Sequence, residues 1–389
     1  MRILSVSNFF DTHGGGLERV AGHLAREFAL TGYDSSWAAS DADGLPQSPA
    51  RAIGLNCLNP TEALTGLPMP LPTPRAIGRL ARAIGASDVV VIHDALYVTS
   101  IIAMALAKLR RKPVVLIQHI AAIPFASAAM RALMRTANAL VTRPMLAAAD
   151  RLVFISAVVR EDLLGPDPKR ASLLLFNGVD QAIFHTAAAQ DRQAIRARWN
   201  LPVDGPLAIF VGRFVEKKGL AVLRSLAADR PDMCFALVGQ GPIRPDDWGL
   251  QNVRVLGQQE QAAVADLFRA GDALVLPSVG EGYPLVIQEA MACGLPVVCG
   301  EPSARSDPQA AQWLSGVEID LADPIASARR CGHALDDLLR MPSDRHAMAS
   351  YAAATYNWSR MAARLLDGLF DRTGARTLPG SGIACEQHG

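Results

Sequence analysis

The chain has 389 residues, half of them apolar, and its 38 basic residues nearly balance its 37 acidic ones. This length is too great for one hydrophobic core and fits two domains of ordinary size. The balanced charge excludes any bulk electrostatic case for nucleic-acid binding. The six cysteines form no CxxC pair, and we interpret them as buried thiols of a chain that needs no oxidising compartment.

We expect neither a signal peptide at the amino terminus nor a membrane-spanning helix elsewhere in the chain. Residues Met1–Ser7 run straight into a strand-like segment, without a charged region and a long apolar stretch before a cleavage site, so we expect no signal peptide. No uninterrupted apolar run reaches about 18 residues, so no spanning helix is expected. We therefore expect a cytoplasmic protein.

In the first half of the chain, short apolar runs alternate with helical periodicity, which predicts a parallel sheet with crossover helices. The runs are continuously apolar, as is typical of strands covered on both faces. A helix that stops at Gly32 is predicted by apolar residues at helical spacing: Leu17, Val20, Ala21, Leu24 and Phe28. The predicted strands are Arg2–Ser7, Asp88–His93, Pro113–His119, Arg151–Ser156 and Ser172–Phe176.

The pattern breaks near residues 177–180 and restarts after a polar stretch, which places a domain boundary near residues 178–190. The strands predicted in the second half are Pro206–Gly212, Met233–Gly239, Val253–Gly257, Ala273–Ser278 and Pro296–Gly300. The helices predicted there are Lys217–Asp229, Gln261–Ala270 and Leu285–Ala292.

These patterns predict an α/β chain of two doubly wound parallel-sheet domains, residues 1–180 and residues 181–355. Such sheets bind ligands at the carboxyl ends of their strands, so two facing sheets define one interdomain cleft. Residues 373–389 are rich in Gly, Ser and polar groups without periodicity, and we expect them to form a disordered tail.

The strongest chemical signal is the segment EGYPLVIQE at residues 281–289, which follows a predicted strand and opens a helix. Free backbone N–H groups at a helix start bind anions. Glu281 and Glu289 are suited to accept hydrogen bonds from hydroxyl groups, such as those of a sugar and a ribose. The alternative is an acid favoured by the helix dipole at Glu281 and a surface acid at Glu289.

The second signal is the segment VGRFVEKKG at residues 211–219. Arg213 leaves the end of a predicted strand, and Lys218 is expected at the start of the next helix. Two cations there can neutralise a diphosphate without a metal and stabilise charge on a departing diphosphate. A solvated basic turn is the alternative.

Glycine-rich turns follow two predicted strands, at residues 14–16 and 239–241. They allow a ligand to approach the backbone, but each is a weak signal alone, and a flexible loop explains either equally well. Neither has the GxGxxG pattern, and the chain has no GxxxxGK[ST] loop, which argues against a dinucleotide or ATP fingerprint.

Other polar residues carry weaker signals. His93 and His119 end predicted strands that point into the cleft, and His93 taken alone is more simply a structural histidine. The Asp41-Ala42-Asp43 segment resembles a metal-binding DxD, but it lies among Ser, Gly and Pro, which favours a polar loop. No cluster of His, Cys or carboxylates has metal-ligand spacing.

The segment of residues 124–149 is long, apolar and dotted with arginines. It is either an amphipathic patch on an anionic membrane or a pair of ordinary helices covering the first sheet.

Taken together, these motifs resemble glycosyltransferase family four, the retaining enzymes of the GT-B fold. Single pieces are weak, but their order and spacing are specific and cover nearly the whole chain. The segments that carry the resemblance are residues 14–19, 154–160, 177–180, 211–219, 238–242, 276–278 and 281–298.

The resemblance implies a catalytic set of Glu281, His119, Arg213 and Lys218. Arg213 and Lys218 would clamp the diphosphate, Glu281 would face the hydroxyls of the donor sugar, His119 would shape the reacting face, and Glu289 would bind the ribose. Further donor contacts are implied for Gly15, Gly16, Gly239, Gly282, Tyr283, Pro284 and Leu285.

The resemblance also implies that a sugar moves from a nucleoside-diphosphate sugar to an acceptor hydroxyl, with retention, without a divalent ion and without another cofactor. The acceptor would be a saccharide or a lipid-linked saccharide, in polysaccharide or glycolipid synthesis. A helix over about residues 356–372 would pack back on the first domain, and closure of the two domains would exclude water.

One departure from the family and three alternatives remain. Residues 301–305 read EPSAR where the family usually has a glycine pair before Pro-Glu, which leaves the sugar identity open. A sugar-nucleotide epimerase of the same fold would turn over without an acceptor. A two-lobed solute-binding protein would need an export signal. An inactive scaffold is expected to lose Arg213, Lys218 or the glutamates, and all are present.

Overall fold

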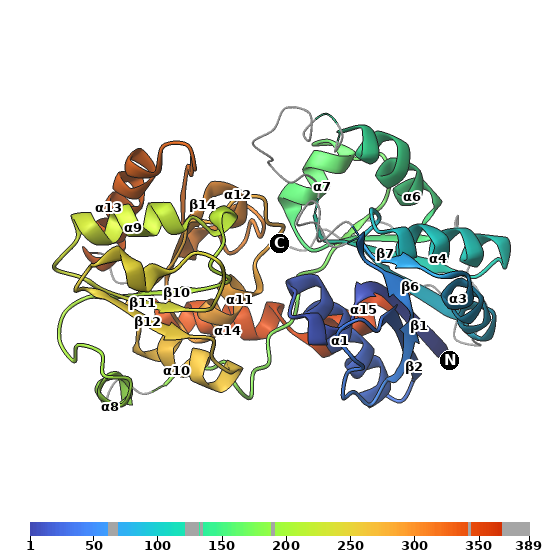
Figure 1. Ribbon diagram of the computed structural model, residues 1–389, viewed down its shortest axis with the longest axis horizontal. Coiled ribbons are helices and arrows are strands. Elements are labelled where there is room, and N and C mark those ends of the chain that lie inside the picture. Colours follow the sequence, from blue (N-terminus) through green and yellow to red (C-terminus); the bar gives the residue numbers. More distant parts are fainter. Residues whose placement is uncertain (61–68, 121–131, 133–134, 188–190, 341–343, 368–389) are drawn as a thin grey trace.

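The computed structural model describes residues 1–60, 69–120, 132, 135–187, 191–340 and 344–367. Two parallel sheets lie in separate lobes (Figure 1). The seven-stranded sheet has the order β3-β2-β1-β6-β7-β8-β9, and the six-stranded sheet has the order β12-β11-β10-β13-β14-β15. Both orders reverse beside their first strand, β1 or β10, and in doubly wound sheets this reversal is where ligands bind.

The strands of the first sheet are β1 (Arg2–Phe9), β2 (Asp34–Ser40), β3 (Arg51–Leu55), β6 (Val89–His93), β7 (Val114–Gln118), β8 (Arg151–Phe154) and β9 (Leu173–Leu174). A small antiparallel pair consists of β4 (Cys57–Leu58) and β5 (Leu71–Pro72). The strands of the second sheet are β10 (Leu207–Val211), β11 (Cys234–Val238), β12 (Val253–Gly257), β13 (Ala273–Leu276), β14 (Val297–Gly300) and β15 (Leu314–Val317).

Helices connect these strands in both lobes. Those before the second sheet are α1 (Gly16–Leu30), α3 (Pro74–Ala86), α4 (Val98–Leu109), α6 (Arg143–Ala148), α7 (Ala157–Leu164) and α8 (Asp191–Arg198). Those within and after it are α9 (Leu220–Asp229), α10 (Gln261–Ala270), α11 (Leu285–Ala292), α12 (Glu301–Ala304), α13 (Pro324–Arg340), α14 (Arg345–Thr355) and α15 (Trp358–Leu366). Single turns are η1 (Asp11–His13), η2 (Asn138–Thr142), η3 (Glu216–Lys218), η4 (Pro245–Trp248) and η5 (Ala311–Trp313).

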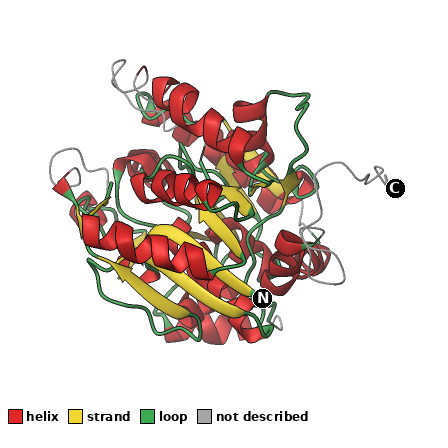
Figure 2. Cartoon of the chain, turned by 90° about the vertical axis from the view of Figure 1, so that its right-hand side faces the viewer, coloured by secondary structure: helices red, strands yellow, loops and turns green. Residues whose placement is uncertain are grey.

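The first sheet is buried on both faces, as its continuous apolar strands predict. Successive side chains of β6 alternate between faces: Val90 and Ile92 pack with α3, α4 and α6, while Val89 and Val91 pack with α1 and α15. Figure 2, which views the molecule from the side of this lobe, shows helices on either side of the strands. The sheet is thereby held rigidly with its carboxyl edge free to carry polar groups.

The chain passes between the two lobes at two neighbouring places. Val179 donates its backbone N–H to the carbonyl of Tyr356 at 3.0 Å. A Cβ atom on Gly178 would lie 2.3 Å from the Trp358 ring, so only glycine fits there. From this point α15 packs beside α1 (Figure 1), and the His23 ring stacks on Trp358 with 4.7 Å between centroids.

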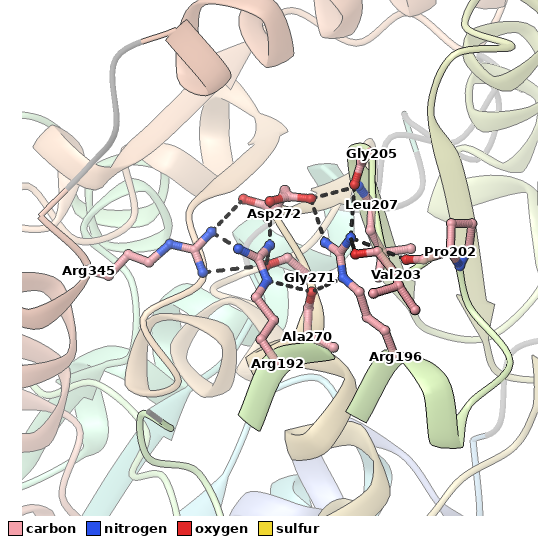
Figure 3. Close-up of polar contacts among 10 residues, drawn as sticks. All are labelled: Arg192, Arg196, Pro202, Val203, Gly205, Leu207, Ala270, Gly271, Asp272 and Arg345. Atoms are coloured by element: carbon pink, nitrogen blue, oxygen red, sulfur yellow. Dashed lines mark hydrogen bonds and ion pairs between the residues drawn. The ribbon is translucent and has the colours of Figure 1, made fainter. Parts of the chain in front are cut away.

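A polar cluster fastens α8 to the amino end of the second sheet (Figure 3). The Asp272 carboxylate pairs with Arg192 and with Arg196, whose Nη2 lies 2.8 Å away, and accepts the backbone N–H of Leu207 at 2.7 Å. Arg345 of α14 reaches the carbonyl oxygen of the neighbouring Gly271 at 3.4 Å. The cluster lies at the edge opposite the carboxyl ends of the strands and has a structural role.

Candidate functional site

The residues of the 211–219 segment meet Glu281 at the carboxyl edge of the second sheet. Lys218 Nζ lies 2.8 Å from Glu281 Oε2, and Lys217 Nζ lies 3.9 Å from Glu281 Oε1. Burial chiefly lowers the pKa of Lys217; Glu281 raises it, and repulsion from Lys218 and the exposed Arg213 lowers it further. Three cations and one carboxylate therefore share this edge, with an excess of positive charge for an anion.

The placement of Lys218 differs from the prediction. The predicted helix Lys217–Asp229 is wrong at its start, because Lys218 ends the single turn η3 and α9 begins at Leu220. Gly219 between them has φ of +74°, and a Cβ atom there would lie 2.2 Å from the Pro277 carbonyl oxygen. This glycine brings Lys218 close to the chain that leads to Glu281.

The second glutamate has a partner from the other lobe. Glu289 lies within α11, nearly buried, and its Oε1 is 3.0 Å from Arg19 Nη2 in the first turns of α1. Burial raises the pKa of Glu289, and the Arg19 guanidinium counteracts this by favouring the charged form. Sequence reasoning gave Arg19 no role, although it ends the motif GGGLER.

At the start of α11 the side chains of Tyr283 and Leu285 are turned into the protein. Pro284 is the N-cap and Leu285 the first helical residue, whose side chain packs against the core shared by α1 and α15. The Tyr283 side chain is buried in the second lobe, where its hydroxyl lies 2.9 Å from that of Tyr356. Any contact of Tyr283 with a ligand must therefore come from its backbone.

Gly282 and Gly239 are required by close approaches of backbone. A Cβ atom on Gly282 would lie 2.0 Å from the carbonyl oxygen of His119 in the other lobe, and one on Gly239 would lie 1.9 Å from the Gly212 oxygen. Ser306 joins the lobes beside this contact: its Oγ donates to the Gly282 carbonyl at 2.7 Å, and its carbonyl accepts from Ala157 N–H at 2.8 Å. The two carboxyl edges therefore meet at Gly282.

The histidines lie at the carboxyl edge of the first sheet. β6 ends at His93 and β7 one residue before His119; His93 Nδ1 is 3.3 Å from His119 Nε2. Burial lowers the pKa of His119 to about 3 and that of His93 well below its ordinary value, so both rings are neutral at pH 7. His93 Nε2 has no hydrogen-bond partner among the described residues.

Asp94 is a residue of this edge that the sequence argument did not single out. Its carboxylate accepts the backbone N–H groups of His119 at 3.3 Å and Ile120 at 3.2 Å, and its own φ is +66°. Burial raises its pKa to about 6. A carboxylate directly after the strand-ending His93 is the signal that could have identified it, and it fixes the turn that carries His119.

The three glycines after β1 differ in what they require. Gly14 has φ of +81°, and no atom would contact a Cβ on Gly16. A Cβ on Gly15 would lie 1.9 Å from Glu18 Oε2, because the Glu18 carboxylate folds back over the start of α1. Burial raises the pKa of Glu18. The helix start therefore already carries an acidic group, which competes with a phosphate at this point.

Three further sequence predictions concern the 301–305 segment, metal ligands and membrane-spanning helices. The segment 301–305, where the chain departs from the family pattern, contains the short helix α12. Asp43 pairs with His13 at 2.8 Å in a turn, and no group of three or more His, Cys or carboxylate side chains within the described ranges is placed to hold a metal ion. No helix in the described part of the chain is long and apolar enough to cross a membrane.

The 124–149 segment lies partly outside the described residues, which omit 121–131 and 133–134. In its described part, α6 buries Met145 and Leu146 against the first sheet, while Leu140 and Arg143 are exposed. Leu140 is the large apolar side chain that this described part leaves at the surface.

Each of the two lobes matches a known protein-family model. Residues 14–182 match the family model Glycosyltransferase Family 4, and residues 191–355 match the model Glycosyl transferases group 1. The D-inositol 3-phosphate glycosyltransferase of Streptosporangium roseum is 33% identical over 258 residues, which are 60% of this chain and 57% of that protein. The Mycobacterium tuberculosis protein of the same name is 33% identical over 228 residues, 52% of this chain and 44% of that protein. The match thus spans about half the length of these relatives.

Solved structures agree with the fold. Sucrose-phosphate synthase from Thermosynechococcus elongatus has a TM-score of 0.71 at 22% identity, over 94% of this chain and 97% of that one. HepE from Anabaena, solved in complex with UDP and glucose, has a TM-score of 0.69 at 16% identity, over 95% and 99% of the two chains. The expected GT-B fold is confirmed, and the two family matches, one for each lobe, show that the chain belongs to glycosyltransferase family 4.

Proposed function

We propose that the protein transfers a sugar from a nucleoside-diphosphate sugar to an acceptor hydroxyl, with retention of configuration and with protein cations in place of a divalent ion. The observation that carries the proposal is the meeting of Arg213, Lys217, Lys218 and Glu281 at the edge that faces His119. The names of the relatives, and the UDP and glucose in the HepE structure, support a nucleotide-sugar donor.

In this proposal Arg213 and Lys218 hold the diphosphate and stabilise the charge that develops as the bond to the sugar breaks. Glu281 accepts hydrogen bonds from the sugar, and Glu289 accepts them from the ribose. His119 is neutral and can exchange a hydrogen bond with a sugar hydroxyl without adding charge. The family resemblance favours same-face attack by the acceptor, assisted by the departing phosphate, over a covalent glutamate intermediate.

Calorimetric titration of the purified protein with UDP, GDP and ADP, each with and without EDTA, tests the proposal. We expect one diphosphate to bind tightly and equally in both conditions. Binding that EDTA abolishes would contradict the metal-free clamp, and binding of none would contradict the donor assignment. An NMR spectrum of the product reports retention, and a change of the sugar without an acceptor would instead indicate an epimerase.

For the acceptor, we infer a saccharide or lipid-linked saccharide at the inner face of the membrane. The exposed Leu140, which lies between the exposed Arg135 and Arg143, supports this inference. Flotation of the protein with anionic liposomes at low salt tests it, with Leu140→Ser as the variant that should weaken association. No association of the wild-type protein would contradict it.

A further inference from the structure

The ion pair between Arg19 and Glu289 places a first-domain cation inside the donor site proposed above. Glu289 keeps only 8% of its side-chain surface exposed, whereas Arg19 keeps 35%. A buried carboxylate is stable in its charged form only with a close cation or several strong hydrogen bonds. Here the cation comes from α1, and the carboxylate from α11 in the other lobe.

A bound ribose would not replace this cation. Ribose hydroxyls are neutral, so they can donate hydrogen bonds to Glu289 but cannot balance its charge. Lys218 is paired with Glu281, and in the proposed function Arg213 and Lys218 face the diphosphate. The charge of Glu289 therefore still needs Arg19 when the donor is present.

The Arg19 guanidinium also has N–H groups that do not contact Glu289. Arginine has five N–H donors, and the contact with Glu289 is made by Nη2 alone. Arg19 keeps 35% of its side-chain surface exposed, so the protein does not enclose this side chain.

We propose that Arg19 is a donor-positioning residue that stays paired with Glu289 in the loaded enzyme, aims that carboxylate at the ribose hydroxyls, and donates a further N–H to the donor. The proposal rests on the proposed function above and adds a residue of the first domain to the ribose site. It makes recognition of the ribose depend on contact between the two lobes.

The test is the affinity of Arg19→Met for UDP, GDP and ADP and for their 2′-deoxy forms, measured by calorimetry. Methionine keeps much of the apolar length of arginine but has no charge. We expect the tightest diphosphate to bind about ten- to a hundredfold more weakly, as for loss of a charge-assisted hydrogen bond. We also expect the wild-type preference for ribose over 2′-deoxyribose to shrink, with Arg19→Lys between the two.

Arg26→Met is the matched control, because Arg26 lies on the same helix but is exposed and outside the proposed site. It should bind like the wild type. A second readout is pH: without Arg19 the pKa of Glu289 rises further, so binding to Arg19→Met should begin to fall at a higher pH as acid is added.

Unchanged or tighter binding by Arg19→Met, with the wild-type ribose preference, would overturn the proposal; tighter binding would mean that Arg19 competes with the donor for Glu289. A wild-type protein that binds none of the three diphosphates would remove the proposed function as well, so the two failures are distinguishable. Circular dichroism and the melting temperature show whether Arg19→Met is folded, and Arg19→Lys provides the same comparison if it is not.

Discussion

The carboxyl edges of the two sheets face each other, yet they handle charge in opposite ways. The first edge holds His93, Asp94 and His119, all buried, with both histidines neutral. The second edge holds cations and Glu281 in ion pairs that remain partly exposed. The comparison teaches that one fold, used twice, can supply one edge with neutral imidazoles beside a buried carboxylate and one edge with cations in ion pairs.

Burial accounts for the difference. Desolvation disfavours the charged form of a group, so buried imidazoles lose their proton. On the second edge burial also lowers the pKa of Lys217, and the Glu281 carboxylate beside it counteracts this. In the proposed reaction the cations of the second edge would hold the diphosphate, and the neutral histidines of the first edge would face the sugar.

The largest effect on activity is expected from removing a positive charge from the carboxyl edge of the second sheet. Lys218→Met should lower kcat/KM for the donor by about a hundredfold or more, because a cation fixed at the leaving group is lost. Lys217→Met is the matched control: its Nζ is 3.9 Å from Glu281 instead of 2.8 Å, so a much smaller loss is expected. Steady-state kinetics with saturating acceptor measures kcat/KM for both variants. An equal loss in both would contradict the larger role given to Lys218.

The next largest effect on activity is expected from disturbing the contact between the two carboxyl edges. Gly282→Ala would place a Cβ atom 2.0 Å from the His119 carbonyl oxygen, so the two edges must move apart. We expect kcat/KM to fall about tenfold, because catalytic groups are displaced, with little change in melting temperature. Gly78→Ala, at an exposed helical position where a Cβ meets nothing, should keep full activity. Wild-type activity in Gly282→Ala would show that the contact at Gly282 is not needed.

The next effect is a pH dependence of stability that comes from His23 in the first lobe. Burial lowers its pKa to about 4 when folded, while the unfolded chain titrates near 6.5. The unfolded state therefore binds the extra proton, and the stability that neutral His23 contributes is lost as pH falls below 6.5. Between pH 8 and 5.5 the free energy of unfolding of the wild type should fall by about 1.4 kcal/mol more than that of His23→Phe. Phenylalanine is chosen because it keeps an aromatic ring stacked on Trp358. Urea unfolding at both pH values measures this, and parallel curves would contradict it.

The smallest effect concerns a side chain that turns away from the cleft. Tyr283→Phe removes the hydroxyl that lies 2.9 Å from that of Tyr356, which should lower the free energy of unfolding by about 1 kcal/mol. Nucleotide affinity should stay at the wild-type value, because the Tyr283 side chain is buried in the second lobe. A weaker diphosphate affinity in calorimetry would show that the side chain takes part in binding.

The sequence predicted continuously apolar strands well, at the edge of a sheet as well as at its centre, and missed polar or small-residue strands. Val253–Gly257 and the helices Gln261–Ala270 and Leu285–Ala292 are confirmed at both ends. The strands β2 and β15 were missed, because DSSWAAS and LSGV are too polar or small to give an apolar run. Such strands form because the sheet already present offers them hydrogen bonds, which no local pattern records.

The site was predictable only within each lobe. Lys218 and Glu281 follow neighbouring strands of one sheet, so their meeting follows from the topology of parallel strands. The pairing of Arg19 with Glu289 depends on how the lobes are set against each other, as does the approach of Gly282 to His119. That arrangement is decided by packing between residues distant in the chain, and no motif encodes it.

The two crossings between the lobes have one more consequence. Because Val179 is hydrogen-bonded to Tyr356, the second lobe enters and leaves the first at one point. It is therefore an insertion with adjoining ends, a cassette held in the first lobe between β9 and α15. A segment of this kind can be exchanged as one piece between relatives, so that a new second lobe joins an old first lobe without a new junction elsewhere.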